Sequence, residues 1–307
     1  MIEPTTAYSG FTEYYFKARW LQTNCNLGNK PYTGPEADMN VHDKLMQENE
    51  IYDCVNRRYA GFSNVPQDLW FRAETPKFGK LGQSHQNLIA AYQTQQWDIV
   101  TFWYALLVHR ITGSGASFNV DHGYRNSVVK HLGTCTNIDQ MYDQIRSWSR
   151  RGVPMFTSIG NQPPAPKKGV TNVDFLLNEA EKLLHTLYWH VWERKGCLGH
   201  KDIVDFLNAY NIEQGHRRFN FAYSAFAMDI SDYWPEFVNE LSHTYLGNNA
   251  KRCAKQLFTK TERISDELFF DAVMDQLAKD TGGLPKDLED VMCDYIRYIN
   301  GYEANQR

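Results

Sequence analysis

The feature that most constrains this chain is a helical spacing of apolar side chains that recurs along most of its length. In residues 173–194, apolar positions follow one another at intervals of three, four and seven residues: Leu176, Ala180, Leu183, Leu184, Leu187 and Val191. Gly196 stands shortly after the cationic end of this run, and glycine is a common helix terminator. Residues 173–194 are therefore predicted to form one long helix.

Similar patterns predict helices before and after this segment, and no alternating strand with a hairpin turn competes with them. Residues 97–111 are apolar nearly all round, which indicates a helix buried in the centre of the fold. We therefore expect an all-α, multi-helix protein with well over half of its residues in helices. Residues 97–111 and 173–194 should be two of the longest helices.

The strongest candidate boundary is the segment "GNQPPAPKKG" at residues 160–169. It contains three prolines within four residues, which cannot continue a helix and which hold the chain in an extended path. This segment divides the chain into an N-terminal helical half, residues 1–160, and a C-terminal helical half, residues 161–307. One continuous domain is the alternative.

The charge balance limits the partners that the chain can have. The sequence carries 32 Lys and Arg against 36 Asp and Glu, a net charge of -4, which argues against non-specific coating of nucleic acid. Any contact with DNA should therefore be local. Four short basic clusters are candidates, each also readable as a solvated face: residues 146–151, 166–168, 216–218 and 251–255.

Cysteine spacing and hydropathy narrow the class of protein further. The six cysteines lack the paired spacing of zinc or redox sites, so we expect reduced thiols and no structural metal. The first ten residues lack a cationic segment followed by an apolar run, and no stretch approaches the roughly 18 apolar residues of a membrane span. These features predict a soluble, cytoplasmic protein without a membrane partner.

Residues 244–258 place polar and cationic groups around a predicted helix start. Asn248 or Asn249 would be the N-cap, and Lys251 and Arg252 follow just inside the helix. Cations oppose the dipole at a helix N-terminus unless an anion lies between them. The segment is therefore a candidate anion site, and a helix whose basic residues simply face water is the alternative.

The predicted helix that begins near residue 219 carries an acid on an apolar face. Asp229 lies about two turns after Phe221 and Tyr223. A carboxylate on such a face must be paired or must take part in chemistry, whereas an Asp near a helix end can also simply face water.

Three short elements follow one another in a recognisable order: Gly152, Phe156 and Thr157; then Phe221, Asp229 and Ile230; then Gly247, Ala250 and Arg252. They resemble the Gly-x-x-x-Phe-Thr element, the Asp-bearing helix and the Gly-Pro-Gly-Ala-x-Arg element of the alpha-glutamyl/putrescinyl thymine pyrophosphorylase family of bacteriophages. Asn248 and Asn249 stand where that family has Pro-Gly. The resemblance implies an all-helical fold that is distantly similar to helix-hairpin-helix DNA glycosylases.

The resemblance also implies a reaction, which belongs to the hypermodification of thymine in phage DNA. A 5-(pyrophosphoryloxymethyl)uracil base loses pyrophosphate from its exocyclic carbon, and an amino acid or polyamine takes its place. The partners would be DNA that contains modified uracil and an amine co-substrate, in the cytoplasm of the infected host. The sequence predicts no cofactor, although Mg²⁺ could accompany the pyrophosphate.

This chemistry suggests a role for each group of candidate residues. Asp229, or alternatively His216, would take the proton of the amine. Asn248, Asn249, Lys251 and Arg252 would bind the departing pyrophosphate. Amino-acid or base binding would fall to Arg57 or Arg125 for the carboxylate and to Phe156, Thr157 and Tyr223 around the base. The DNA backbone would be held by Lys167, Lys168, Arg217 and Arg218.

Two other classes of function remain open at this point. A base-excision glycosylase could use the same helical fold, with Asp229 stabilising a cationic sugar. A helical DNA-binding protein without catalysis would need none of these polar groups.

Overall fold

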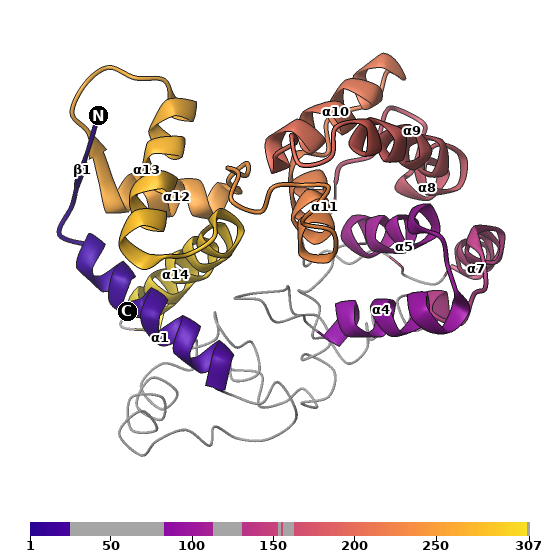
Figure 1. The fold of residues 1–307 in the computed structure, drawn as a ribbon, viewed down its shortest axis with the longest axis horizontal. Helices are drawn as coiled ribbons and strands as arrows, with labels where there is room; N and C mark the ends of the chain where they lie inside the picture. The colour runs from indigo at the N-terminus through magenta and orange to yellow at the C-terminus, as the bar shows by residue number, and fades with distance from the viewer. Residues whose placement is uncertain (25–82, 113–130, 153–154, 156–162, 306–307) are drawn as a thin grey trace. The chain divides into compact units, whose positions relative to one another are not determined.

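The computed structural model describes residues 1–24, 83–112, 131–152, 155 and 163–305 (Figure 1). The structure is 67% helical, and its described residues contain a single two-stranded sheet. The all-α prediction is therefore confirmed. In the described part of the chain, no helix has both the length and the apolar character that crossing a membrane requires.

The chain forms two compact units, whose boundary lies at Tyr245 and Leu246. Unit 1 contains the described residues 1–24 and 246–305, and unit 2 contains the described residues between 83 and 245. This division differs from the one expected at residues 160 and 161. The reason is packing, because helices from both expected halves share the core of unit 2.

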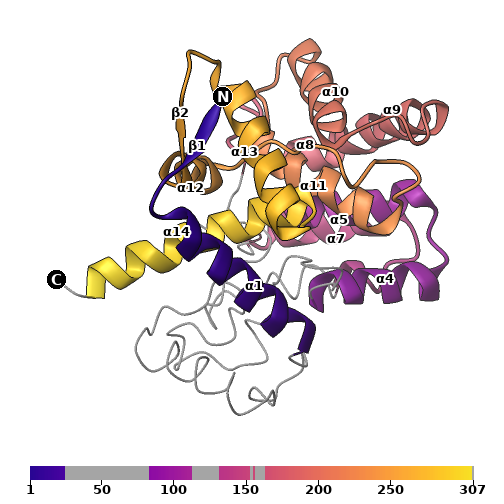
Figure 2. The same cartoon turned by 60° about the vertical axis from the view of Figure 1, so that its left-hand side comes forward.

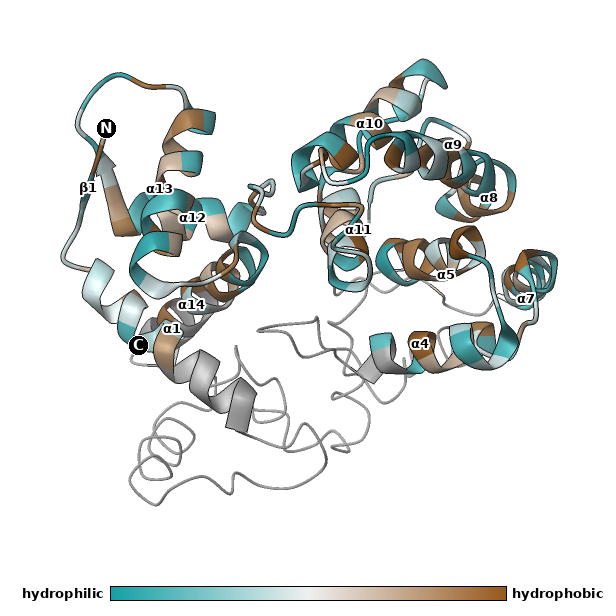
Figure 3. Cartoon of the chain, viewed as in Figure 1, coloured by the Kyte–Doolittle hydropathy of each residue, from teal (hydrophilic) through white to brown (hydrophobic). Residues whose placement is uncertain are grey.

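Unit 2 consists of seven described helices: α4 (Gln83–Gln95), α5 (Ile99–Ile111), α7 (Ile138–Arg150), α8 (Asn172–Asn178), α9 (Ala180–Glu193), α10 (His200–Glu213) and α11 (Asn220–Tyr233). Helix α5 packs against α4, α9 and α11. All of its residues from Val100 to Ile111 are buried, and most of it has the brown colour of apolar residues in Figure 3. The prediction of a central buried helix is therefore confirmed, with Asp98 as its N-cap.

The predicted long helix at 173–194 is in fact two helices, α8 and α9, which meet at Glu179. Thr171 and Asp174 form a reciprocal capping box that begins α8. The apolar spacing continues across the break, so periodicity alone could not reveal it. The two helices that we expected to be longest have fewer residues than α14, which has 21, and α1, which has 17.

Unit 1 is built around its last helix. Its elements are β1 (Ile2–Pro4), α1 (Tyr8–Asn24), α12 (Asn248–Leu257), β2 (Phe258–Lys260), α13 (Asp266–Thr281) and α14 (Pro285–Asn305). Helix α14 packs against α1, α12 and α13, and the antiparallel strands β1 and β2 lie side by side (Figure 2). In this pairing Ile2 lies opposite Lys260, so the first described strand belongs to the same unit as residues 246–305.

Candidate active site

The acid on α11 forms an ion pair inside the core of unit 2. Asp229 is completely buried. Its Oδ2 accepts a hydrogen bond of 2.6 Å from Arg110 Nε, and its Oδ1 accepts one from Arg110 Nη2. The same Oδ1 lies 3.0 Å from His85 Nε2. The carboxylate is thus held by two nitrogens on one edge of a guanidinium and by one imidazole, and it does not face water.

These charges determine the protonation state of the acid. Burial by itself would raise the pKa of the Asp229 carboxyl. The positive charge of Arg110, His85 and the hydrogen bonds from both residues together outweigh burial, and they hold that pKa well below its usual range. Asp229 is therefore ionised at neutral pH, and it cannot readily take a proton from a substrate.

Three helices bring these residues together. His85 comes from α4, Arg110 from the last turn of α5 and Asp229 from α11. A cation in the last turn of a helix is favoured by the helix dipole. The sequence prediction missed both partners of Asp229. The one available signal was the charged Arg110 at the end of an otherwise apolar helix.

Two polar atoms beside this ion pair have no hydrogen-bond partner among the described residues. They are His85 Nδ1 and the hydroxyl of Tyr233, and both are buried. The rings of His85 and Tyr233 lie 6.2 Å apart, and His109 stands edge-on to His85 at 5.2 Å. Buried polar atoms in proteins are nearly always bonded, so such atoms are typical of a site that receives a ligand or water.

We call His85, Arg110, Asp229 and Tyr233 the acid–base cluster. Because ionised Asp229 can only accept, the His85 nitrogen that faces it must carry the proton. A neutral His85 then has its lone pair on Nδ1. The group that can accept a proton in this cluster is therefore the histidine, and Asp229 is the residue that orients it.

His216, the alternative proton acceptor, lies elsewhere in unit 2. It precedes α11, and Asp229 is nine residues into that helix, about 14 Å along the axis. His216 is buried against Phe175, and both of its ring nitrogens lack a partner among the described residues. Burial and the nearby charge of Lys167 lower the pKa of His216. It is thus neutral at pH 7 and separate from the acid–base cluster.

Two of the basic clusters meet on the surface of unit 2. The backbone N–H of Arg217 donates to the carbonyl of Pro166 at 2.6 Å, and Lys167 Nζ donates to the carbonyl of Gln214 at 3.3 Å. These bonds join two loops that are about 50 residues apart in sequence. The four cations of the two loops are all exposed: Lys167, Lys168, Arg217 and Arg218. We call them the basic patch.

Of the residues predicted to bind the base or the amino acid, only Tyr223 lies in the described part of the chain. Tyr223 is completely buried, and its hydroxyl donates to Asn211 Oδ1 at 2.9 Å. Its ring is enclosed by the core, so the prediction that it stacks on a base is wrong. Arg57, Arg125, Phe156 and Thr157 lie outside the described residues.

The predicted anion site at the start of α12 already contains an anion from the protein itself. The N-cap is Gly247 and neither Asn248 nor Asn249, so the predicted cap is wrong. The backbone N–H of Gly247 donates to the buried carboxylate of Glu289 at 2.9 Å. Glu289 lies in α14, which packs against α12, so a side chain distant in sequence meets the positive end of the helix.

The two cations of α12 that were predicted to bind pyrophosphate lie at the surface of unit 1. Arg252 is exposed, and Lys251 lies over the ring of Phe270 at 5.9 Å. Both belong to unit 1, whereas the acid–base cluster belongs to unit 2. We therefore describe α12 and the acid–base cluster as separate features.

Comparisons with known proteins identify no relative of this chain. No protein-family model, no curated protein and no solved structure matches the chain. The fold and the site themselves define a mostly helical protein with a buried acid–base cluster and an exposed basic patch in one unit.

The ion pair leads to a prediction about stability. Arg110→Met should lower the free energy of unfolding by about 3–5 kcal/mol, because it leaves the Asp229 charge buried without its partner. The double variant Arg110→Met/Asp229→Leu removes both charges and should recover most of that loss. Urea unfolding at pH 7 measures both. A single variant as stable as the wild type would contradict the role given to the pair.

The low pKa of Asp229 gives a second prediction. A carboxyl whose pKa is lower in the folded state stabilises the protein above its unfolded pKa of about 4, and this stabilisation is lost as the pH falls further. Lowering the pH from 7 to 3 should therefore reduce the free energy of unfolding more for the wild type than for Arg110→Met/Asp229→Leu. The same unfolding experiment at the two pH values checks this. A difference that does not depend on pH would contradict it.

The start of α12 gives a third prediction. Glu289→Ala should lower the free energy of unfolding by about 1–3 kcal/mol, because the part-buried N–H of Gly247 loses its acceptor. Glu289→Gln keeps an acceptor oxygen and should lose less. Arg252→Ala is the control on the same helix and should stay within about 0.5 kcal/mol, since that side chain is exposed. Equal stability of all three variants would show that Glu289 does not stabilise this helix start.

Proposed function

We propose that this protein is a DNA-modifying transferase that displaces pyrophosphate from 5-(pyrophosphoryloxymethyl)uracil with an amino acid or polyamine. The all-helical architecture distantly similar to helix-hairpin-helix glycosylases, which the sequence resemblance implies, is part of this proposal. The observation that carries it is the environment of Asp229. The acid of the family-like motif lies at the centre of a buried cluster and orients a histidine whose second ring nitrogen has no partner among the described residues.

The reaction needs a free amine, and the acid–base cluster contains a group that can produce one. An ammonium co-substrate would give a proton to His85 Nδ1, and the imidazolium that forms would be stabilised by the adjacent Asp229 carboxylate. Arg110 keeps that carboxylate ionised and fixes its orientation. In this proposal His85 is the catalytic base, and Asp229 and Arg110 are positioning residues.

The remaining steps balance without an additional reactant. The C–O bond to pyrophosphate breaks, and its electron pair leaves with the pyrophosphate. The exocyclic carbon then has methide-like character, conjugated with the uracil ring, and the amine nitrogen forms the new C–N bond. Water would compete for such a carbon, so a buried base favours the amine over hydrolysis.

The basic patch supports DNA as the partner. Its four exposed cations could each contact a backbone phosphate, which fixes the position of the duplex or strand without reading its sequence. A local patch also agrees with the net charge of -4, because a net negative chain is not expected to be coated by DNA over its whole surface. The pyrophosphate role predicted for Lys251 and Arg252 is not carried into this proposal, because Glu289 already accepts a hydrogen bond at the start of their helix.

A second candidate function follows from the same patch. A helical DNA-binding protein without catalysis would need Lys167, Lys168, Arg217 and Arg218 but no acid–base cluster. The glycosylase candidate has weaker support. A carboxylate that stabilises a cationic sugar must face that sugar, whereas Asp229 is completely buried and both of its oxygens already accept hydrogen bonds from Arg110.

The deciding experiment is mass spectrometry of nucleosides. The protein is incubated with DNA that contains the pyrophosphorylated base and with a mixture of amino acids and polyamines, and the DNA is then digested. The proposal expects a nucleoside in which an amine has replaced pyrophosphate. Release of free base would favour the glycosylase, and DNA that is bound but unchanged would favour the non-catalytic protein.

The proposed roles give a fourth prediction. His85→Gln should lower the rate of transfer by roughly 10²–10⁴, the usual contribution of a general base. His190→Gln is the matched control, because His190 stacks on Phe206 outside the acid–base cluster. The far-ultraviolet circular dichroism of both variants shows whether they fold. A folded His85→Gln variant with the wild-type rate would remove His85 from the mechanism.

A further inference from the structure

His216 is a buried titratable side chain that the proposed reaction does not use. It lies in the loop that joins α10 to α11, where Gly215, at φ +71°, turns the chain after α10. The residue is only 6% exposed, and its ring stands edge-on to the ring of Phe175 in α8, with the ring centres 5.9 Å apart. The side chain of His216 thus joins the loop between α10 and α11 to helix α8.

The same loop carries one half of the basic patch, and two hydrogen bonds join it to the other half. The backbone N–H of Arg217 donates to the carbonyl of Pro166 at 2.6 Å, and Lys167 Nζ donates to the carbonyl of Gln214 at 3.3 Å. In the sequence, His216 lies between the two residues of its loop that take part in these bonds. A movement of His216 out of its place would therefore disturb both of them.

The surroundings of the His216 ring disfavour a positive charge. Both ring nitrogens are buried and lack a partner among the described residues. A neutral imidazole carries one N–H group, whereas a protonated imidazole carries two and a positive charge. Burying an unpaired charge costs more than burying a neutral polar group, so this place favours the neutral ring.

Two charged groups act on the ring from neighbouring elements. Lys167, in the loop before α8, opposes a positive charge on His216, and Glu179, at the junction of α8 and α9, favours it. Two further neighbours carry no charge: Phe175, and Asn211 of α10, whose carbonyl accepts the backbone N–H of His216 at 2.7 Å. Burial has the largest effect, and burial and Lys167 together outweigh Glu179 and lower the pKa of His216.

We propose that a proton on His216 separates the two loops, so that the halves of the basic patch are joined at neutral pH and come apart in mildly acid solution. A protonated ring gains water as its partner by leaving its buried position. This movement takes the loop between α10 and α11 away from α8 and breaks both hydrogen bonds between the loops. The inference concerns the fold of the patch, and only its consequence for DNA rests on the proposed function.

The pH range of the change follows from the two states of the ring. In the open state the ring is in water, with the ordinary histidine pKa of about 6.5, and in the closed state its pKa is lower. The closed state is therefore fully favoured above about pH 6.5 and loses stability as the pH falls below this value. Between the two pKa values the ratio of open to closed molecules should rise by up to about tenfold per pH unit, because the open state binds one more proton.

The test follows amide hydrogen exchange of the full-length protein by NMR at about pH 7.5 and about pH 5.5, without DNA. Corrected for the intrinsic effect of pH on exchange, the protection of the Arg217 N–H should fall by up to about tenfold at the lower pH. The N–H of Asn239 is the internal control, because it donates to the carbonyl of Leu198 at 2.9 Å in another loop contact of unit 2. Its unchanged protection would distinguish separation of the patch loops from unfolding of the whole unit.

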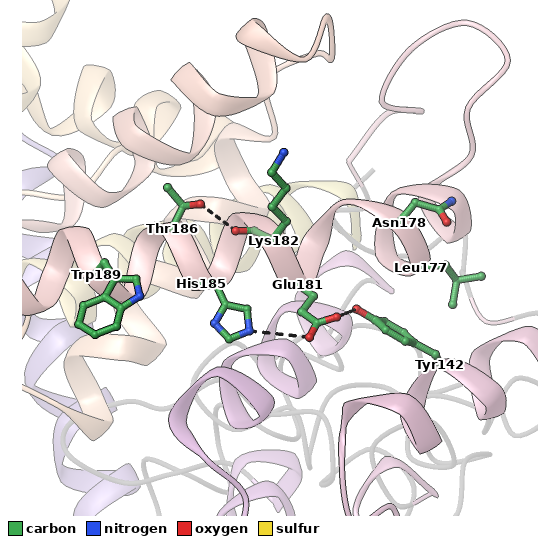
Figure 4. Close-up of a pocket in the computed structure, with 8 residues that line it drawn as sticks. All are labelled: Tyr142, Leu177, Asn178, Glu181, Lys182, His185, Thr186 and Trp189. Atoms are coloured by element: carbon green, nitrogen blue, oxygen red, sulfur yellow. Dashed lines mark hydrogen bonds and ion pairs between the residues drawn. The ribbon is translucent and has the colours of Figure 1, made fainter.

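Two variants assign the effect to one ring. His216→Leu cannot take a proton, so the protection of Arg217 should be the same at both pH values. His185→Leu is the matched control, because the His185 side chain is 55% exposed in an open groove on α9, where its Nε2 lies 3.7 Å from Glu181 Oε1 (Figure 4). This variant should keep the wild-type loss of Arg217 protection.

The titration of the His216 ring in the wild type needs no variant to fold. Followed by NMR of its C–H groups, it should have its midpoint below about pH 6.5. Three results would overturn the inference: Arg217 protection that does not depend on pH, a folded His216→Leu variant that still loses this protection in acid, or a His216 midpoint at or above about pH 6.5.

The consequence for DNA is measured separately. Relative to His216→Leu, the wild type should bind unmodified DNA less tightly at about pH 5.5 than at about pH 7.5, because its four patch cations no longer form one surface. A patch that opens in acid but binds no DNA at either pH would retain the inference and remove the proposed contact with DNA. A patch that binds DNA but fails the exchange experiment would retain the contact and remove the inference.

Discussion

The arrangement of unit 2 depends on a charged pair that the fold removes from water. Taking Asp229 and Arg110 out of solvent is costly, and their attraction offsets this cost only when the geometry is good and the remaining lone pairs are bonded. The structure meets both conditions with two parallel hydrogen bonds from the guanidinium and a third contact from His85. Because the three residues belong to three helices, the pair also restricts how α4, α5 and α11 can pack.

The same pair explains why a carboxylate in this position positions another residue and does not itself take a proton. Two charged groups held together keep the acid ionised, so in the proposed reaction the neighbouring imidazole is the group that takes the proton. The rings of His109 and Tyr233 lie against His85, which is itself buried. A buried and oriented base agrees with a reaction in which water must not compete with an amine, and this is the physical basis of the proposed function.

Cationic and anionic groups are used differently in the two units. In unit 1 the positive start of α12 is neutralised from inside by Glu289, which stabilises the contact between α12 and α14. In unit 2 the basic patch is exposed. Exposed cations remain available to a partner, whereas a buried carboxylate at a helix start is already satisfied. The second unit is therefore the better candidate for the proposed contact with DNA.

The sequence by itself determined the helical class of this protein and the burial of α5, because apolar spacing and all-round apolar character act locally along the chain. It also indicated that Asp229 must be paired or active. It could not identify the partner, since Arg110 is 119 residues away, nor the anion at α12, since Glu289 belongs to another helix. The tertiary structure likewise decided the helix break at Glu179 and the burial of Tyr223. It also decided the contact between the loop of Lys167 and the loop of Arg217. Charges, caps and aromatic faces acquire their roles from neighbours that packing brings together, and local spacing carries no information about those neighbours.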